Sequence, residues 1–258
     1  MLNIIRNLDC DTNTECNDRI NDVKDIAWIN SLNPDKLKSD HNPFISVDFN
    51  NKLNSNKYYQ TSIKRLLDIL IAGVALLLLS PLMLSVALLI KMESPGKCIF
   101  KQQRVGKNGK HFCFYKFRSM STNCISLKEL QLSIKSDRQG ICTKFKNDPR
   151  VTKLGRILRK YSIDELPQLY NVLTGDMSLV GPRPAMVSEV DQYSMREKRR
   201  LAVMPGITGL WQVSGRADLD FEKQVELDVE YIETLSFKTD LKLLMFTIPA
   251  VIFCRGAY

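Results

Sequence analysis

The sequence predicts a mainly α-helical protein with a small β-hairpin (α+β) that is monotopic, meaning that it enters a membrane from one side only. Three observations predict this class: an uncharged apolar run at residues 69–90, an Asn-Gly turn between two aromatic-rich segments, and amphipathic helical patterns in the second half. We expect a flexible polar N-terminal arm at residues 1–60 and a membrane-associated domain at residues 61–258, with a membrane helix at about 66–91.

The charge is unevenly distributed between these two parts. Residues 1–60 hold nine acids, seven bases and twelve asparagines, without a sustained apolar period, which is typical of a flexible arm. Residues 61–258 hold 30 bases and 19 acids, a net charge of +11. A part this basic is expected to meet an anionic partner, which would be nucleic acid, anionic lipid or a phosphorylated substrate.

The cysteine and histidine content disfavours two common kinds of site. The seven cysteines show no CxxC spacing, and the chain has only two histidines, His41 and His111. A zinc site of paired ligands and a Ser–His–Asp hydrolase are therefore both disfavoured. Scattered cysteines of odd number fit a reducing compartment, in which they stay reduced and buried.

The apolar run is long enough to form a membrane helix. Its 22 residues contain no charge, and as a helix they reach about 33 Å, close to one hydrocarbon thickness. Basic residues lie on both sides of the run, with Lys64 and Arg65 before it and a longer cluster after it. Since short basic flanks mark the cytoplasmic side, a straight crossing would leave one cluster on the wrong face.

The dipeptide Ser80-Pro81 at the middle of the run suggests how both flanks could stay on one side. Proline removes a backbone donor and disturbs the carbonyl four residues earlier, while serine can donate to a freed carbonyl. We therefore expect a re-entrant helix broken at Ser80-Pro81, with Asp68 pairing with Lys64 or Arg65 at the interface. The alternative is an ordinary spanning helix with a tolerated kink.

The elements after the run follow from local patterns. Residues 98–105 and 110–118 flank Gly106-Lys107-Asn108-Gly109, which predicts a β-hairpin. Residues 120–147 are polar and aperiodic and are expected to form an exposed insertion. Apolar periodicity predicts helices at 150–160 and 221–235, and the uncharged residues 243–254 suit a helix in the interface or against the core.

The segment at residues 158–184 holds an adjacent pair of carboxylates, Asp164 and Glu165. One interpretation is a capping box from Ser162 to Glu165 at the start of a helix, which would give the pair a purely structural role. The other rests on the surrounding bases, because a carboxylate among guanidinium groups stays ionised and can act as a nucleophile or metal ligand. Carboxylates among phosphate-binding cations suggest Mg²⁺-assisted phosphoryl transfer.

A second candidate segment is the glycine-rich stretch at residues 205–216. It contains Gly206, Gly209 and Gly215 around Trp211. It is either a connector with a core tryptophan or a loop that brings backbone and Arg216 close to a ligand.

From Lys64 to the C-terminus the chain resembles the bacterial monotopic phosphoglycosyl transferases. The resemblance covers about three-quarters of the chain and lies in five stretches: KRLLDILIAGVALLLLSP, FKQQRVGKNGKHFCFYKFRSM, DPRVTKLGRILRKYSIDELPQLYNVLTGDMSLVGPRP, PGITGLWQVSGR and the closing GAY. The N-terminal 60 residues do not match the transmembrane helices of larger members. The GAY ending and the WQVSGR segment are similar to those of hexose-1-phosphate transferases, so galactose or glucose is the first expectation for the sugar.

The resemblance implies transfer of a sugar-1-phosphate from a UDP-sugar to undecaprenyl (polyprenyl) phosphate, with release of UMP and a requirement for Mg²⁺. It implies that Asp164 of the Asp164-Glu165 dyad forms a covalent phosphosugar intermediate, and that Asp164 also serves the metal. It implies phosphate-binding roles for Lys116, Arg159, Arg183 and Arg216, and a re-entrant helix with its anchor and break at Lys64, Arg65, Asp68, Ser80 and Pro81.

The implied setting is the cytoplasmic face of the bacterial inner membrane, in the first membrane step of exopolysaccharide, capsule or O-antigen synthesis. Expected partners are the UDP-sugar, undecaprenyl phosphate and membrane lipids but no nucleic acid, and a homo-oligomer is left open. The competing hypothesis is a membrane-tethered basic protein that binds nucleic acid or a scaffold without catalysis.

Overall fold

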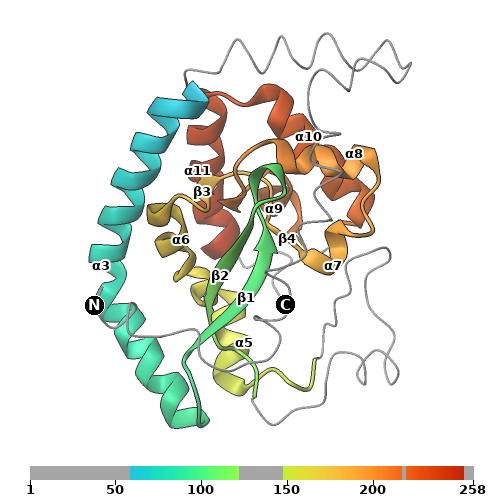
Figure 1. The fold of residues 1–258 in the computed structure, drawn as a ribbon. Coiled ribbons are helices and arrows are strands. Elements are labelled where there is room, and N and C mark those ends of the chain that lie inside the picture. Colours follow the sequence, from blue (N-terminus) through green and yellow to red (C-terminus); the bar gives the residue numbers. More distant parts are fainter. Residues whose placement is uncertain (1–58, 122–147, 217–218, 253–258) are drawn as a thin grey trace, which may run out of the picture. The chain divides into compact units, whose positions relative to one another are not determined.

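The computed structural model describes residues 59–121, 148–216 and 219–252 (Figure 1). The expected N-terminal arm, apart from its last two residues, and almost all of the expected insertion lie outside these residues. The longer elements are α3 (Lys64–Glu93), β1 (Ile99–Val105), β2 (His111–Phe117), α5 (Lys153–Lys160), α6 (Gln168–Thr174), α10 (Phe221–Thr234) and α11 (Phe237–Ile252). The shorter ones are η2 (Tyr59–Ile63), η3 (Lys107–Gly109), η4 (Ile163–Glu165), β3 (Ser178–Val180), β4 (Ala185–Met186), α7 (Val187–Val190), α8 (Met195–Lys198), η5 (Arg199–Ala202), β5 (Gly206–Thr208) and α9 (Leu210–Ser214).

This set of elements confirms a mixed helical and strand protein in which helices dominate. Of the described helices, α3 is the one long and apolar enough to cross a membrane. The helices predicted at 150–160 and 221–235 are confirmed as α5 and α10. The last predicted helix begins earlier than expected, since α11 starts at Phe237 and includes three charged residues before its uncharged part.

The long helix α3 continues across Ser80-Pro81, so the expectation of a helix broken there is corrected. Pro81 lies inside α3, and the Ser80 hydroxyl donates to the Leu77 carbonyl at 2.8 Å. That carbonyl is the one whose usual donor a proline removes, so the side chain satisfies it and the helix persists. Figure 1 shows α3 bowed along its length. The re-entrant path itself stays a prediction.

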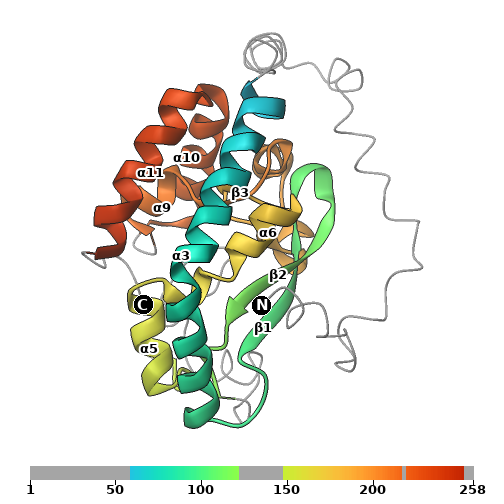
Figure 2. The same cartoon turned by 90° about the vertical axis from the view of Figure 1, so that its left-hand side faces the viewer.

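One side of α3 packs against the rest of the described chain along its whole length. Its first half contributes Ala72 to the main core, and its second half contributes Val86 and Ile90 to a second cluster with Phe117 and Leu158. In Figure 2 α3 crosses in front of α6, against which it packs. Strand β2 and helix α5 thus lie against the far half of α3, and both bear charged side chains.

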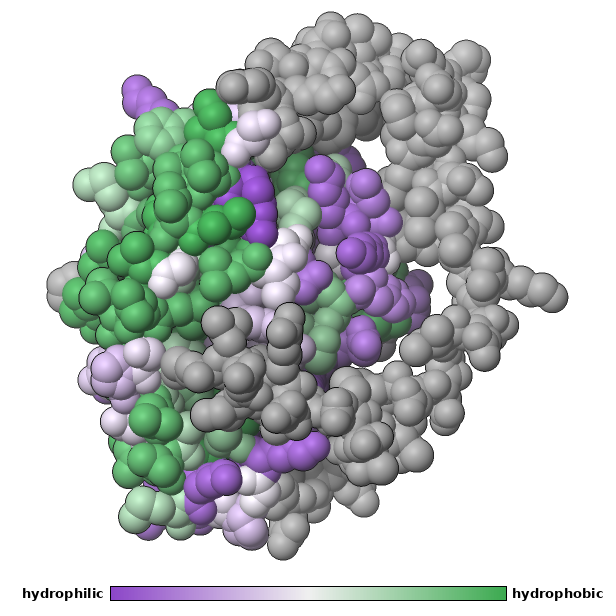
Figure 3. All heavy atoms as spheres, turned by 60° about the vertical axis from the view of Figure 1, so that its left-hand side comes forward, coloured by the Kyte–Doolittle hydropathy of each residue, from purple (hydrophilic) through white to green (hydrophobic). Residues whose placement is uncertain are grey.

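The opposite side of α3 is an exposed apolar surface. Leu77 is 75% exposed, and other apolar side chains of the helix are exposed as well: Leu66, Leu70, Val74, Leu78, Leu84, Leu88 and Met92. Figure 3 shows apolar residues gathered over the side where α3 lies. A contiguous surface of this kind on a protein marks a membrane or partner contact.

Buried polar contacts fix the start of α3. The Lys64 ammonium forms an ion pair with Asp240 of α11 and donates to the Val180 carbonyl at 3.0 Å. The Asp68 carboxylate accepts from the Leu179 amide at 3.0 Å. The expected pairing of Asp68 with Lys64 or Arg65 is thus corrected, because Lys64 finds its direct partner on α11.

Arg65 contacts backbone carbonyls of α6 and not the Asp68 carboxylate that was one of its expected partners. Its guanidinium donates to the Val172 and Leu173 carbonyls near the end of α6, the latter at 2.9 Å. These carbonyls belong to the last helical turn, where backbone donors become scarce and a cation is favoured. Arg65 therefore ties α3 to the C-terminus of α6.

The predicted hairpin is confirmed as an antiparallel pair of β1 and β2. The register runs from Ile99 opposite Phe117 to Val105 opposite His111, and the turn is closed by η3. Asn108 has a φ of 54° there, which asparagine tolerates better than most residues. Strand β4 adds to the outer edge of β1.

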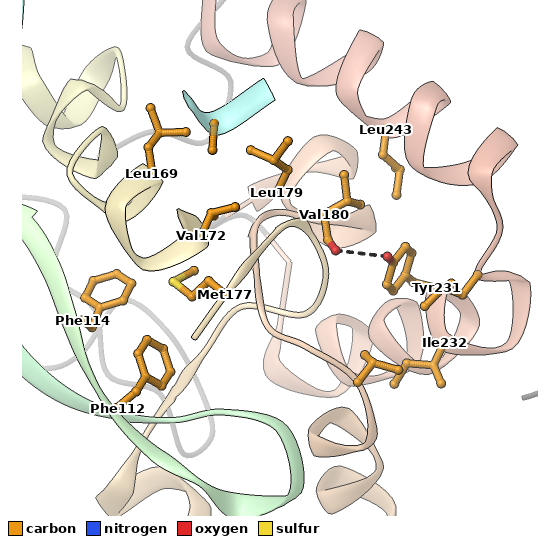
Figure 4. Packing of buried hydrophobic residues seen from close by; sticks show 13 residues of the cluster. Phe112, Phe114, Leu169, Val172, Met177, Leu179, Val180, Tyr231, Ile232 and Leu243 are labelled. Carbon is orange, nitrogen blue, oxygen red and sulfur yellow. Dashed lines mark hydrogen bonds between the residues drawn. The ribbon is translucent and has the colours of Figure 1, made fainter. Parts of the chain in front are cut away.

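The main core lies between the hairpin, α6, β3 and the last two helices (Figure 4). Phe112 and Phe114 from β2 face Leu169, Val172 and Met177, while Leu179 and Val180 reach toward Tyr231 and Leu243. The Tyr231 hydroxyl donates to the Val180 carbonyl at 3.1 Å. The core therefore holds β3 rigidly against α10 and α11.

Candidate active site

The acidic pair lies in a short turn between two helices. Asp164 and Glu165 are in η4, which follows α5 and precedes α6. Ser162 has a φ of 55° and makes no side-chain capping bond, so the capping box is not formed. Instead, Arg183 donates to the Glu165 carboxylate at 2.7 Å. The predicted capping box is therefore wrong.

The four predicted cations come from four different parts of the chain and lie around this pair. Lys116 is on β2, Arg159 is in the last turn of α5, Arg183 follows β3, and Arg216 follows α9. Lys116 and Arg183 act electrostatically on both carboxylates, while Arg159 acts on Asp164 and Arg216 on Glu165. The structure thus brings together all six residues that the sequence singled out.

The two carboxylates differ in their protonation because their surroundings differ. Burial raises the pKa of Asp164 to about 6, the neighbouring Glu165 adds to this, and the nearby cations oppose it. Burial alone would also raise the pKa of Glu165, but the Arg183 guanidinium holds that pKa below its usual range. Asp164 is 7% exposed. One group is thus a fixed anion and the other is poised to titrate near neutrality.

Burial and neighbouring charges also change the pKa values of the cations. Burial lowers the pKa of Lys116 to about 8, against the opposing influence of Asp164. The Glu165 carboxylate raises the pKa of Arg183. Arg159 donates from Nε to the Ser119 hydroxyl at 2.9 Å, which points its guanidinium in a fixed direction. A phosphate entering here would meet positive groups that are already in place.

Close backbone packing holds the segments of Arg183 and Arg216 together. Strands β3 and β5 pair in parallel, and the Gly206 amide donates to the Pro182 carbonyl at 2.8 Å. A side-chain carbon at Gly206 would lie 2.1 Å from the Gly181 nitrogen, and one at Gly181 would lie 2.3 Å from the Met204 oxygen. Only glycine permits this approach, so these glycines place Arg183 beside the segment that ends in Arg216.

Three supporting residues were not predicted from the sequence. Ser119 orients Arg159, as described. Arg118 donates to the Ser94 and Pro95 carbonyls beyond the end of α3, at 2.7 and 2.6 Å. Asn171 exchanges hydrogen bonds with the backbone of Tyr115 and Cys113, at 3.2 and 2.7 Å. Arg118 and Ser119 directly follow Lys116-Phe117. Their closeness in sequence to the predicted site residue Lys116 is the one feature that could have indicated a supporting role.

The donor set at the pair is compatible with a magnesium ion shared with a substrate. Among the described residues no group of three or more His, Cys, Asp and Glu side chains could hold a metal alone. In the same part of the chain no hydrogen-bond donor reaches the Asp164 carboxylate, whereas Glu165 is held by Arg183. Mg²⁺ commonly binds through one or two carboxylates and completes its shell with substrate phosphate and water. The residues therefore fit such an ion.

The comparisons with known proteins identify the family. The bacterial sugar transferase family matches residues 59–254, so the chain belongs to that family. Over 250 residues it is 41% identical to the galactosyl transferase CpsE of Streptococcus agalactiae, covering 93% of this chain and 55% of that protein. Over 198 residues it is 42% identical to the exopolysaccharide production protein ExoY of Rhizobium meliloti, covering 76% of this chain and 88% of that protein.

A third relative has a more specific name. The chain is 44% identical over 199 residues to the undecaprenyl-phosphate galactose phosphotransferase of Salmonella typhimurium, covering 76% of this chain and 42% of that protein. The chain therefore spans about half the length of two of these three relatives and most of the length of the third.

Proposed function

We propose that this protein transfers a sugar-1-phosphate from a UDP-sugar to undecaprenyl phosphate, producing an undecaprenyl-diphosphate-sugar and UMP. The observation that supports this most is the buried Asp164-Glu165 pair with Lys116, Arg159, Arg183 and Arg216 around it. Both substrates are polyanions, and a carboxylate approaching a diphosphate needs compensating cations. The names of the relatives point to the same acceptor and to galactose among the sugars.

The reaction proceeds in two displacements at one phosphorus atom. In the first, an Asp164 carboxylate oxygen attacks the sugar-linked phosphorus of the UDP-sugar, the bond from that phosphorus to the bridging oxygen breaks, and UMP leaves with the bonding pair. In the second, an oxygen of undecaprenyl phosphate attacks the same phosphorus and the bond to Asp164 breaks. The carboxylate is thereby regenerated, and no redox step or additional co-reactant is required.

The other residues of the site position and stabilise. Arg183, held by Glu165, and the buried Lys116 meet the charge that accumulates on the phosphate oxygens. Arg159 is oriented by Ser119 and does the same from the α5 side. Mg²⁺, bound by Asp164 and substrate phosphate, would supply additional positive charge for the leaving phosphate.

The apolar face of α3 supports a membrane setting for this chemistry. A helix whose outer side is apolar from Leu66 to Leu89 and whose inner side packs on protein is suited to burial in one leaflet. We infer that the protein acts at the cytoplasmic face of the bacterial inner membrane, where nucleotide sugars are available, and that it serves exopolysaccharide or capsule synthesis. The lipid acceptor would then reach the site from the bilayer.

The direct test is UMP release from UDP-galactose and UDP-glucose by the membrane-reconstituted protein with Mg²⁺ and undecaprenyl phosphate. Asp164→Asn should lower the rate by at least about 10³-fold, because an amide cannot act as the nucleophile. Asp191→Asn, the same change at an exposed position, should leave the rate unaltered. Near wild-type turnover by Asp164→Asn would contradict the proposal. Salt-sensitive nucleic-acid binding without any UMP release would favour the scaffold hypothesis instead.

A further inference from the structure

A concave feature lies between α9, α10 and α11. It is an open cleft of about 780 Å³. Its polar side is formed by Gln212, Ser214, Gly215, Arg216, Glu230, Thr234, Lys238, Thr239 and Lys242, and its apolar side by Leu210, Val213, Leu243, Phe246, Pro249 and Ala250. None of the roles assigned above, apart from that of Arg216, uses these residues.

The charge of the cleft favours an anion. Among the described residues, three cations line it, Arg216, Lys238 and Lys242, against one acid, Glu230. Lys238 and Lys242 are four residues apart on α11, so their side chains share one face of that helix. Both are exposed, which leaves their ammonium groups accessible to a ligand. A phosphate group is the anion that such a set of lysines and an arginine commonly binds.

The apolar side of the cleft continues into exposed surface. Phe246 lines the cleft and is also half exposed. Other exposed apolar residues follow along the same helix: Leu241, Met245, Ile248 and Ile252. These exposed side chains extend the apolar character of the cleft outward.

Arg216 belongs both to the cleft and to the carboxylate site. It lines the cleft at the end of α9, and its guanidinium acts electrostatically on Glu165. Its φ of 52° is unusual for a residue other than glycine, and such a conformation persists where the surroundings enforce it. A ligand bound in the cleft with its phosphate at Arg216 would therefore be adjacent to the acidic pair.

We propose that the cleft between α9, α10 and α11 binds the acceptor, a long-chain isoprenoid phosphate, with its phosphate at Arg216, Lys238 and Lys242 and its first isoprene units along Leu243, Phe246 and Pro249. This inference rests on the proposed function and adds the place where the acceptor enters. A nucleotide would use the cations but not the apolar wall that leads outward along α11. An isoprenoid phosphate uses both.

The test is equilibrium binding of radiolabelled undecaprenyl phosphate to the purified full-length protein, combined with steady-state kinetics. The double variant K238Q/K242Q should weaken acceptor binding and raise the acceptor KM by at least about tenfold, since two charge-assisted contacts are lost. The KM for UDP-sugar and the release of UMP in the absence of acceptor should stay unchanged. Ala250→Trp, which narrows the cleft without removing charge, should weaken acceptor binding in the same way.

The matched control is K110Q/K223Q, which removes two positive charges from exposed positions outside the cleft. It should leave acceptor binding unaltered. Unchanged acceptor binding in both cleft variants would overturn the inference, as would a rise in the UDP-sugar KM, which would indicate a nucleotide site. Reduced flotation of K238Q/K242Q with acceptor-free anionic vesicles would also overturn it, because the lysines would then serve ordinary lipid headgroups. If the wild type binds the acceptor but releases no UMP, the proposed function is contradicted, whereas the assignment of the cleft to the acceptor stands.

Discussion

Asp164 is subject to two opposing electrostatic influences, and their balance decides what this carboxyl can do. Burial and the adjacent Glu165 favour the protonated form, while Lys116, Arg159 and Arg183 favour the anion. Burial has the larger effect, so the pKa of Asp164 is raised to about 6. A carboxylate of this kind is ionised at pH 7 and yet more basic than an ordinary aspartate, and both properties favour attack on phosphorus.

The titration of Asp164 can be measured directly in the magnesium-free protein. We expect ¹³C-labelled aspartate to show two carboxyls that titrate near pH 6, Asp164 and the buried Asp228, of which the Asp164 signal is absent in Asp164→Asn. Lys116→Gln should move the Asp164 midpoint upward, because the ammonium group that lowers the pKa is removed, while Lys116→Arg should move it little. A midpoint near the ordinary aspartate value of about 4 would show that burial does not govern this site.

The sequence predicted those site residues that lie close together in one continuous motif. Asp164 and Glu165 are adjacent, and Arg159 lies close before them. The phosphate-binding roles of Arg183 and Arg216 came from the resemblance, since no local pattern states which carboxylate a distant arginine will meet. The pairing of Arg183 with Glu165 and of Lys64 with Asp240 depends on tertiary packing. The sequence predicted neither, and it suggested Asp68 as a partner of Lys64 or Arg65 instead.

At the scale of elements, local patterns predicted the hairpin and the longer helices, because each has its own turn signal or apolar period. The parallel pairing of β3 with β5 was not predicted, since strands of three residues have too few positions to show a period. The same holds for the continuity of α3, where the proline suggested a break but the Ser80 hydroxyl compensates the lost contact.

The β3–β5 pairing makes a sharp prediction about glycine. Gly206→Ala should lower the free energy of unfolding by about 1–3 kcal/mol and reduce UMP release, because its side chain would collide with the Gly181 backbone and separate the two arginine segments. Gly73→Ala is the matched control, since, apart from the adjacent residues and backbone of its own helix, no atom of the described chain lies within 4 Å of the added carbon. The free energy of unfolding of Gly73→Ala should differ from that of the wild type by less than about 1 kcal/mol. Denaturant unfolding in detergent would compare them, and equal effects would contradict this account.

At the scale of the whole described domain, α3 and the site are parts of one arrangement. The inner side of α3 contributes to both apolar clusters, and its ends are fixed by Lys64, Arg65 and Arg118. A straight crossing by α3 would draw β2 and α5, with their charged side chains, into the hydrocarbon, which is costly. The packing therefore supports the re-entrant path that the basic flanks suggested.

Single-cysteine labelling tests this path. In a background without the native cysteines, Ser62→Cys and Lys97→Cys should both react with a membrane-impermeant maleimide from the cytoplasmic side of inverted vesicles, since both positions are exposed before and after α3. Neither should react in sealed spheroplasts. Labelling of the two positions from opposite sides would establish an ordinary spanning helix and leave the charge argument without support.

The central claim is that Asp164 becomes covalently bonded to the transferred phosphosugar, and mass spectrometry of the protein after incubation with UDP-galactose or UDP-glucose and Mg²⁺, without acceptor, tests it most directly. The account predicts a gain of one hexose phosphate on the peptide containing Asp164, which disappears when undecaprenyl phosphate is added. An unmodified peptide in a sample that nonetheless forms the lipid product would contradict it.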